Sequence, residues 1–194
     1  MAALDRYGRL LSTTPFLLPA AKAKTGGMDR LILMRHAKAE RRSASGEDFD
    51  RPLTEQGRAD AAAIGQALAK DGLAPGLALV SGAQRTVDTW EALRTSFPKA
   101  RGQVIRELYN AGPMAILDAL EGTTAGVVMV VGHNPGIHEL AVGLLNEGGA
   151  GSAVVGKIAS RFPPATAVAF VIDENGRAAY DGVFYADDLS GGRA

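Results

Sequence analysis

Two histidines and three arginines stand beside the ends of apolar runs in this sequence. These residues are Arg35, His36, Arg51, Arg85 and His133. Each follows an apolar run of strand length or lies on the loop after such a run. Because ligands of open α/β sheets bind beyond the carboxyl ends of the strands, we expect the five side chains to meet at one edge of a sheet.

Three guanidinium groups around an imidazole suit a dianionic phosphoryl group. Arginine offers a planar fork of donors that matches two phosphate oxygens at once. A neutral histidine nitrogen can attack phosphorus and hold the phosphoryl group covalently, which divides hydrolysis into two easier steps. Cationic donors stabilise the charge of in-line transfer. These residue types together therefore indicate phosphoryl transfer.

The elements that must position these residues alternate along the chain from Met28 onward. Apolar runs predict strands at 30–34, 77–81, 103–108, 126–132, 166–173 and 178–187, the last two forming a hairpin around ENGR. Periodicity and capping residues predict helices at 55–70 after Thr54, at 83–97, at 113–120, and at 135–145 with Asn134 as the N-cap. The glycine-rich stretch 146–165 predicts a connection with room for a helical turn. This alternation predicts a three-layer α/β/α sandwich with a mainly parallel sheet.

Bulk composition excludes several classes of function. Lys plus Arg and Asp plus Glu both number 21, so the formal net charge of zero offers no global field for nucleic acid or an anionic membrane. Cysteine is absent, which excludes disulfides, thiolate metal sites and a cysteine nucleophile. No apolar stretch approaches the ~20 residues that a membrane-spanning helix needs. We therefore expect no nucleic-acid partner, no membrane and a cytoplasmic location.

The length of 194 residues suits one domain with one well-filled core. We expect this domain to span residues 28–194. Residues 1–27 are predicted to be a flexible tail, or the product of a mis-assigned start with Met28 as the true beginning.

At these residues the sequence resembles the histidine phosphatase superfamily, whose members share the phosphoglycerate mutase-like fold. The family's Arg-His-Gly signature, its Ser-Pro-x-x-Arg-Ala-x-x-Thr helix start and its second histidine correspond to RHA at 35–37, SGAQRTVDT at 81–89 and GHNP at 132–135. Three further stretches resemble the SixA-type phosphohistidine phosphatase branch: DRPLTEQGR at 50–58, ELYNA at 107–111 and RFPPATAVAF at 161–170. The resemblance covers residues 28–184. The departures from the family pattern are Ala37 for glycine, Gly82 for proline and Thr86 for alanine.

The resemblance implies a role for each residue of the set. His36 is the expected phosphoryl-accepting nucleophile. The expected phosphate pocket consists of Arg35, Arg85 and His133, and Arg51 joins it in the SixA-type branch.

Glu107 is the expected general acid, because the family's proton donor tends to lie after the third strand. An ion pair with Arg101 or Arg106 is an equally open interpretation of this residue. Asp48, on the loop before Arg51, is the second choice.

The implied activity is that of a metal-independent phosphatase with a covalent phosphohistidine intermediate, and specifically a SixA-like protein phosphohistidine phosphatase. No cofactor and no metal are expected. An alkoxide leaving group needs protonation, which is typically a factor of ~100 or more, whereas a phosphohistidine ring leaves with little help because free imidazole has a pKa of about 6.5. The expected partner is a phosphorylated protein, a histidine phosphotransfer protein being one case, or a small phosphate ester.

Other interpretations stay open at this point. A broad small-molecule phosphomonoesterase or a phosphoglycerate mutase-like enzyme would use the same residues, although such mutases carry long insertions for which this chain has no room. A non-catalytic phosphate-binding module is the non-enzymatic alternative, which the presence of His36 disfavours. His133 and His138 lie five residues apart and would diverge on a helix, which argues against a metal site. The stretch GSAVVGKI at 151–158 lacks the Ser or Thr of a P-loop, so we interpret it as part of the connection.

Overall fold

The computed structural model describes residue 18 and residues 27–189. The tail predicted at residues 1–27 therefore lies outside the described residues except for Leu18 and Gly27, and the predicted domain boundary stays a prediction. Leu18 is 4% exposed and belongs to the hydrophobic core. Its backbone N–H donates a hydrogen bond to the Gly176 carbonyl at 3.3 Å. At least one side chain from before Met28 thus packs on the domain.

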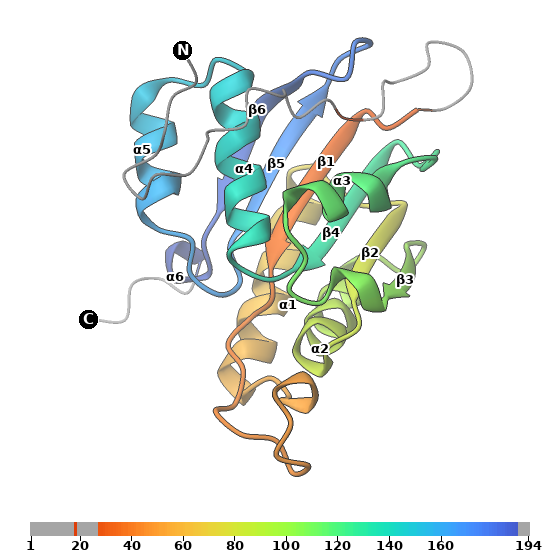
Figure 1. The fold of residues 1–194 in the computed structure, drawn as a ribbon, viewed down its shortest axis with the longest axis vertical. Helices are drawn as coiled ribbons and strands as arrows, with labels where there is room; N and C mark the ends of the chain where they lie inside the picture. The colour runs from red at the N-terminus through yellow and green to blue at the C-terminus, as the bar shows by residue number, and fades with distance from the viewer. Residues whose placement is uncertain (1–17, 19–26, 190–194) are drawn as a thin grey trace.

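A six-stranded sheet forms the middle layer of the described residues (Figure 1). Its strands are β1 (Arg30–Arg35), β2 (Leu77–Ser81), β3 (Arg101–Ile105), β4 (Val127–Gly132), β5 (Ala167–Ile172) and β6 (Ala178–Phe184). They lie in the order β3-β2-β4-β1-β5-β6. Neighbours among β3, β2, β4 and β1 run parallel, whereas β5 and β6 run antiparallel to their neighbours. The predicted mainly parallel sheet and its closing hairpin are confirmed.

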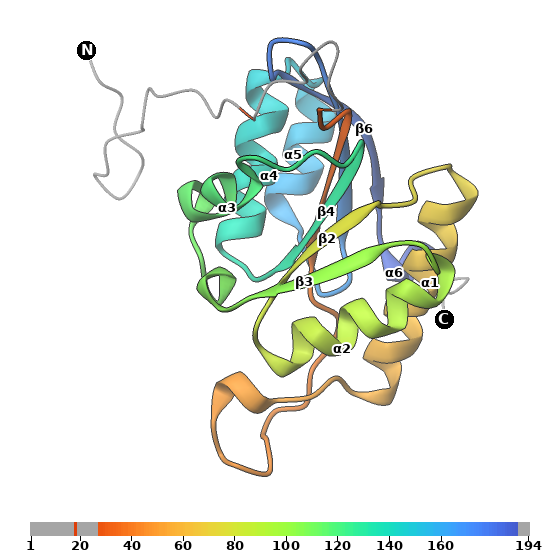
Figure 2. The same cartoon turned by 90° about the vertical axis from the view of Figure 1, so that its right-hand side faces the viewer.

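Helices cover both faces of this sheet, as Figures 1 and 2 show. One face is covered by α1 (Glu55–Lys70), α2 (Gln84–Leu93) and α6 (Ala186–Leu189), the other by α3 (Pro113–Leu120), α4 (Gly136–Glu147) and α5 (Ser152–Ser160). Strand β1 explains the arrangement, because Leu31 and Leu33 pack in the cluster with α4, whereas Ile32 and Met34 pack in the cluster with α1. Successive strand side chains point to opposite faces, so a continuous apolar run requires a helix layer on each side. The predicted three-layer sandwich is confirmed.

Helix α1 begins directly on the chain that follows β1. The Thr54 hydroxyl oxygen accepts a hydrogen bond from the Gly57 backbone N–H at 2.9 Å, which confirms Thr54 as the N-cap. The Thr54 backbone N–H donates to the Lys38 carbonyl at 2.9 Å. A Cβ atom at Gly57 would lie 2.1 Å from that carbonyl oxygen, so only glycine permits this close approach.

Two predicted elements end earlier than the sequence pattern indicates. The strand predicted at 103–108 ends at Ile105, and the short 3₁₀ helix η3 (Arg106–Leu108) follows it. The turn places the Leu108 side chain in the core, where it is 2% exposed, and leaves Glu107 on the surface. The helix predicted at 83–97 ends as α2 at Leu93 and continues only as the 3₁₀ helix η2 (Arg94–Ser96).

The prediction of Asn134 as a helix N-cap is wrong. Helix α4 begins at Gly136 after Pro135, and no side chain caps it. The Asn134 amide instead donates to the Phe162 carbonyl at 3.2 Å. This contact joins segments that are 28 residues apart, and a local capping pattern contains no information about it.

The stretch predicted as a glycine-rich connection contains a full helix, α5. Ile158 is completely buried, and Val154 and Val155 pack beside it against the core. These spacings of three and four residues form one apolar helix face. Gly156 lies opposite with open space around it, so its presence does not prevent the helix. Tertiary packing outweighs the low helix propensity of glycine here.

Candidate active site

The carboxyl ends of β1, β2 and β4 converge beside a short 3₁₀ helix, η1 (Asp48–Asp50). Figure 2 shows η1 next to the N-terminal end of α2, below the carboxyl ends of these strands. His36 follows β1 and His133 follows β4, and their ring centroids lie 5.2 Å apart. The two histidines therefore meet at the sheet edge where the sequence predicts the site.

His36 has one ring nitrogen bound and one free. Its Nδ1 lies 2.8 Å from the backbone oxygen of Ala37. A carbonyl oxygen only accepts, so Nδ1 carries the hydrogen in this bond and Nε2 keeps its lone pair. Burial, together with the charges of Arg85 and Arg35 and against the opposing effect of the Ala37 hydrogen bond, lowers the pKa of His36 to about 4. The imidazole is therefore neutral near neutral pH.

His133 is buried and bound to a strand-end serine. Its Nε2 lies 2.7 Å from the hydroxyl oxygen of Ser81, which follows from the adjacent positions of β2 and β4 in the sheet. Its Nδ1 is buried and has no hydrogen-bond partner among the described residues. Burial, together with the charges of the neighbouring His36 and Arg85, lowers the pKa of His133 to about 3. A neutral ring in which Ser81 donates to Nε2 carries its hydrogen on Nδ1.

Arg35 and Arg85 each use part of their guanidinium group to bind protein oxygens. Arg35 Nη1 donates to the Phe162 carbonyl at 2.8 Å. Arg85 donates from Nη1 to the backbone oxygen of Asp48 at 2.8 Å and from Nη2 to its carboxylate at 3.1 Å. The Nε atoms of both arginines are buried without a partner among the described residues. A buried donor left unpaired costs about 1–3 kcal/mol, so two such donors beside two histidines are suited to binding an anion.

Arg51 reaches this site through Asp48. Its Nε donates to the Asp48 carboxylate at 2.8 Å, and its Nη1 donates to the Glu40 carbonyl at 2.8 Å. The hydroxyl of Tyr109 also donates to the Asp48 carboxylate, at 2.8 Å. This hydrogen bond and the charges of Arg85 and Arg51 lower the pKa of Asp48. Asp48 is therefore ionised and links the two arginines, which does not suit the role of proton donor.

Glu107 lies apart from the network that joins the other residues. It is exposed on η3, and its carboxylate takes part in none of the ion pairs or side-chain hydrogen bonds of the described residues. The alternative interpretation, an ion pair with Arg101 or Arg106, is therefore not observed. Arg106 instead lies over the ring of Phe49, at 5.4 Å from its centroid. The role of Glu107 as a general acid stays a prediction.

Two aromatic residues were not predicted as part of the site. The Tyr109 ring stands perpendicular to His133 at 5.5 Å between centroids, and Phe49 packs edge-on against Tyr109 at 5.0 Å. Tyr109 lies in the ELYNA stretch two residues after Glu107, so that motif could have indicated it. Phe49 has no comparable signal, because its contacts come from segments distant in the sequence.

A second group of polar residues holds the chain after the nucleophile candidate. The Thr89 hydroxyl oxygen accepts from the Ala37 backbone N–H at 3.0 Å and donates to the Arg85 carbonyl at 2.6 Å. The His36 backbone N–H donates to the Gly132 carbonyl at 3.0 Å. The backbone around His36 is thus fixed by β4 and by α2.

Comparison with known proteins agrees with this geometry. A family model described as the histidine phosphatase superfamily (branch 1) matches residues 31–109. An uncharacterised chloroplastic protein of Arabidopsis thaliana is 34% identical over 134 residues, which are 63% of this chain and 62% of that protein. An uncharacterised protein of Mycobacterium tuberculosis is 31% identical over 132 residues, which are 67% of this chain and 81% of that protein. The chain belongs to the histidine phosphatase superfamily.

The structure of a putative phosphohistidine phosphatase SixA from Agrobacterium tumefaciens resembles this member of the histidine phosphatase superfamily over most of its length. The TM-score is 0.71 at 29% identity, and the match covers 81% of this chain and 98% of that chain. The expected SixA-type branch and phosphoglycerate mutase-like fold are confirmed. By contrast, the chain spans only 62% of the length of the Arabidopsis relative that it matches.

One departure from the histidine phosphatase pattern is accommodated without strain. Ala37 stands where the family signature has glycine, and its side chain is completely buried. The backbone of Ala37 does not have a positive φ. The conformation therefore does not require glycine, and the buried methyl group of alanine occupies this position.

His138 and residues 151–158, which the sequence does not assign to the site, lie outside it. His138 stacks on Phe162 at 5.0 Å and its Nε2 lies 2.9 Å from the Ile158 carbonyl, so it is a packing residue of α4 and α5. Residues 151–158 enter α5 rather than a phosphate-binding loop.

Within residues 27–189, no cluster of three or more His, Cys, Asp or Glu side chains could hold a metal ion. No helix in the same part of the chain is long and apolar enough to cross a membrane.

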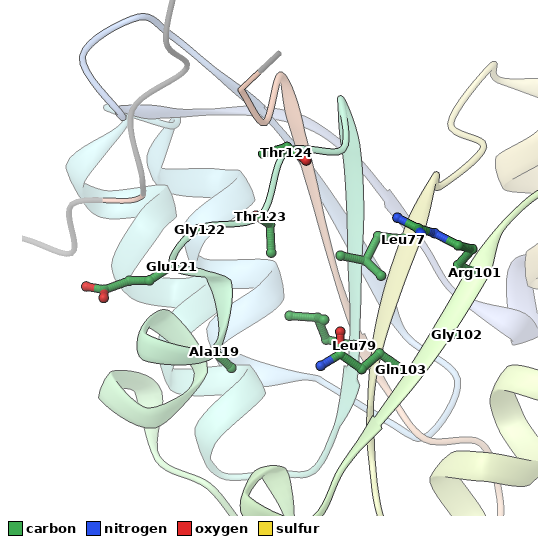
Figure 3. Close-up of a pocket in the computed structure, with 10 residues that line it drawn as sticks. All are labelled: Leu77, Leu79, Arg101, Gly102, Gln103, Ala119, Glu121, Gly122, Thr123 and Thr124. Carbon is green, nitrogen blue, oxygen red and sulfur yellow. The ribbon is translucent and has the colours of Figure 1, made fainter. Parts of the chain in front are cut away.

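A pocket of about 480 Å³ lies away from these residues, between β2, β3 and the loop after α3 (Figure 3). Leu77 and Arg101, the first residues of β2 and β3, line one side, and Thr123 and Thr124 line the other. The strands start here, so this pocket is at the end of the sheet opposite to the two histidines. None of the predicted site residues lines it.

Proposed function

We propose that this protein is a phosphatase in which His36 accepts the phosphoryl group of the substrate on Nε2. The observation that carries the proposal is the bonding of His36, whose Nδ1–H donates to the Ala37 carbonyl while Nε2 keeps its lone pair. The lowered pKa of about 4 maintains this neutral, nucleophilic form at physiological pH. The unpaired Nε donors of Arg35 and Arg85 would then bind oxygens of the phosphoryl group.

The reaction follows in two displacements at phosphorus. In the first, the bond from Nε2 to phosphorus forms while the bond from phosphorus to the leaving group breaks. Arg35, Arg85 and the Nδ1–H of His133 stabilise the charge on the equatorial oxygens. In the second, a water oxygen attacks phosphorus, the N–P bond breaks, and neutral His36 is restored with inorganic phosphate as the product. Arg51, held near the site by its hydrogen bond to Asp48, adds a further positive charge for binding the phosphoryl group.

The leaving group decides how much a proton donor matters. Glu107 is the proposed donor for an alkoxide, because Asp48 is held in its ionised form by Tyr109 and two arginines. A leaving imidazole needs less help, because its own pKa is about 6.5. An exposed and unengaged Glu107 therefore suits a phosphohistidine substrate better than an alkyl phosphate. This argument favours a SixA-like protein phosphohistidine phosphatase, in agreement with the similarity to the putative SixA of Agrobacterium.

The proposed partner is a phosphorylated protein, with a histidine phosphotransfer protein as one case. Between Arg85 and Tyr109 the chain holds only α2, η2, β3 and η3, and no insertion covers the site. An open site admits a phosphorylated side chain that protrudes from a protein surface. It also admits small phosphate esters, so a broad phosphomonoesterase is the second candidate. We further propose that the reaction needs no metal or cofactor.

The test compares three substrates on one enzyme preparation: a phosphohistidine protein, a phosphoserine peptide and a sugar phosphate. We expect turnover that is fastest on phosphohistidine and absent in His36→Ala. The matched control is His138→Gln, which alters the histidine that packs on Phe162 and should keep wild-type activity. Rapid quenching with a labelled substrate should trap an acid-labile phosphoryl group on the wild-type chain. Equal inactivity of wild type and His36→Ala on all three substrates would leave only a phosphate-binding module.

A further inference from the structure

Gly82 stands where the family signature has proline, and the reason lies in the space around this residue rather than in its backbone conformation. The backbone of Gly82 does not adopt a positive φ, so its conformation does not demand glycine. A Cβ atom at this position would lie 3.2 Å from Cζ of Phe49 and 3.3 Å from Cα of Arg106. The proline of the family signature would need the same space. In this chain the missing side chain makes room for the Phe49 ring.

The Phe49 ring seated over Gly82 continues a row of rings that begins at the nucleophile. His36 lies 5.2 Å from His133, His133 lies 5.5 Å from Tyr109, and Tyr109 lies 5.0 Å from Phe49. Phe49 and Tyr109 are both half-buried, so each keeps ring surface open to solvent. The row therefore leads from the half-buried His36 and the buried His133 to ring surface that is open to solvent.

Contacts with charged residues fix both outer rings. The guanidinium of Arg106 lies over Phe49 at 5.4 Å from the ring centroid, and that of Arg85 lies over Tyr109 at 5.7 Å. The Tyr109 hydroxyl donates to Asp48, the residue before Phe49. Ordered rings lose little freedom when a ligand binds, so they suit a recognition surface.

In-line transfer requires the leaving group to lie on the side of phosphorus away from His36 Nε2. In the proposed mechanism, Arg35 at the end of β1 and Arg85 on α2 would bind the phosphoryl oxygens. A leaving group opposite Nε2 would then point out of the site, on the side where Phe49 and Tyr109 keep ring surface open to solvent.

We propose that Phe49 and Tyr109 form an aromatic wall that contacts the leaving group and favours a planar ring there, such as the imidazole of phosphohistidine, over an aliphatic group. This inference rests on the proposed phosphatase function and extends it to substrate choice. Gly82 is a positioning residue, because it acts only by giving Phe49 its place. Aromatic rings attract one another in edge-on and offset-stacked arrangements beyond the effect of buried area, and this contact is the source of the preference.

The first test compares phenyl phosphate with hexafluoroisopropyl phosphate, whose leaving groups have similar acidity but only one of which is a planar ring. Phe49→Leu keeps an apolar side chain of similar volume and removes the ring. We expect the ratio of kcat/KM values, phenyl over fluoroalkyl, to fall about three- to tenfold, which is the effect of one aromatic contact. A fall by the same factor on both substrates would mean that Phe49 only supports the loop, and would overturn the proposal.

The second test uses the space at Gly82. Gly82→Ala places a methyl group against the Phe49 ring, so it should lower the same ratio while leaving Phe49 in the chain. In the Phe49→Leu background the added methyl should change the ratio little, because the two substitutions act on one contact and are not additive. Full additivity of the two effects would contradict a shared mechanism. Unfolding temperatures of all variants identify any loss of folded protein.

A binding measurement separates failure of this proposal from failure of the proposed phosphatase function. Phenylphosphonate and cyclohexylphosphonate cannot be hydrolysed and differ in the planarity of the ring. Calorimetry should show tighter binding of phenylphosphonate to the wild type, and this preference should decrease about three- to tenfold in Phe49→Leu. This result would hold even if wild type and His36→Ala were equally inactive. Equal preferences in wild type and Phe49→Leu would overturn the aromatic wall.

Discussion

Asp48 binds Arg85 through both its backbone and its side chain. The backbone oxygen accepts from Nη1 at 2.8 Å, and the carboxylate accepts from Nη2 at 3.1 Å. Arg85 is 3% exposed, and this contact joins the loop carrying Arg51 to α2. Because the carboxylate also accepts from Arg51 and Tyr109, Asp48 organises cations rather than supplying a proton.

The proton donor can be identified by exchanging each of the two acidic candidates for its amide. We expect Glu107→Gln to lower kcat on a phosphoserine peptide by a factor of about 100, the usual contribution of a general acid. The loss on a phosphohistidine protein should be far smaller, because imidazole leaves without strong acid catalysis. Steady-state kinetics on both substrates measure the contrast.

The comparison variant for this experiment is Asp48→Asn. It should affect both substrates by similar factors, because it disturbs the arginines and not the leaving group. If Asp48→Asn shows the substrate-dependent loss and Glu107→Gln does not, the two assignments must be exchanged.

Arg51 is expected to bind the phosphoryl group, and vanadate inhibition provides a direct measure of this role. Arg51→Gln should weaken inhibition by vanadate about tenfold or more, since a hydrogen bond between charged groups contributes about 1.5–3 kcal/mol. Arg58→Gln is the matched control, because Arg58 pairs with Asp88 at 2.8 Å on α1 and α2 and its side chain is half exposed. Equal inhibition constants in wild type and Arg51→Gln would remove Arg51 from the pocket.

The stability of the fold should decrease in acid because the folded protein holds His133 in its neutral form. The folded-state pKa of His133 is lowered to about 3, below the ordinary value of about 6.5. The unfolded chain therefore binds more protons between these values, and the free energy of unfolding falls as the pH falls from about 6.5 toward 3. Urea titrations at several pH values measure the slope.

The variant that isolates this effect is His133→Asn. It should show a shallower decrease in the free energy of unfolding over that pH range, while the contribution of His36 and the acidic residues stays. An unchanged slope would show that His133 does not titrate as a buried neutral ring.

Metal independence is tested by chelation. Activity should be the same before and after dialysis against EDTA, because the charge of the phosphoryl group is balanced by arginines in the proposed mechanism. Loss of activity with EDTA and its recovery with a divalent cation would contradict the histidine mechanism.

Local patterns in the sequence were sufficient to predict the elements that carry the main site residues. The run LILM is apolar on both strand faces, so this local pattern alone predicts that His36 follows a buried strand. The same holds for β4 and His133. Parallel neighbouring strands end at one edge, which explains why these residues meet although they are far apart in the chain.

Features that depend on contacts between distant segments could not be predicted in this way. The local pattern predicts Asn134 as a helix cap, whereas its amide binds Phe162, and Phe49 has no motif of its own. The end of β3 was placed too late because QVIREL is apolar enough for a strand, whereas Leu108 turns into the core. The prediction of Glu107 rests on the usual place of the family's proton donor after the third strand, and that place says nothing of whether a partner lies beside Glu107.

The chain that follows His36 is held by backbone contacts, from Gly132 to the His36 N–H and from the start of α1 to the Lys38 carbonyl. The imidazole of His36 takes no part in these contacts beyond its own neighbour, Ala37. Removing that ring should therefore leave the arginines in place. Under the proposed function, a chain without the nucleophile would bind the phosphorylated protein without converting it, and so would serve as an affinity reagent for isolating that protein.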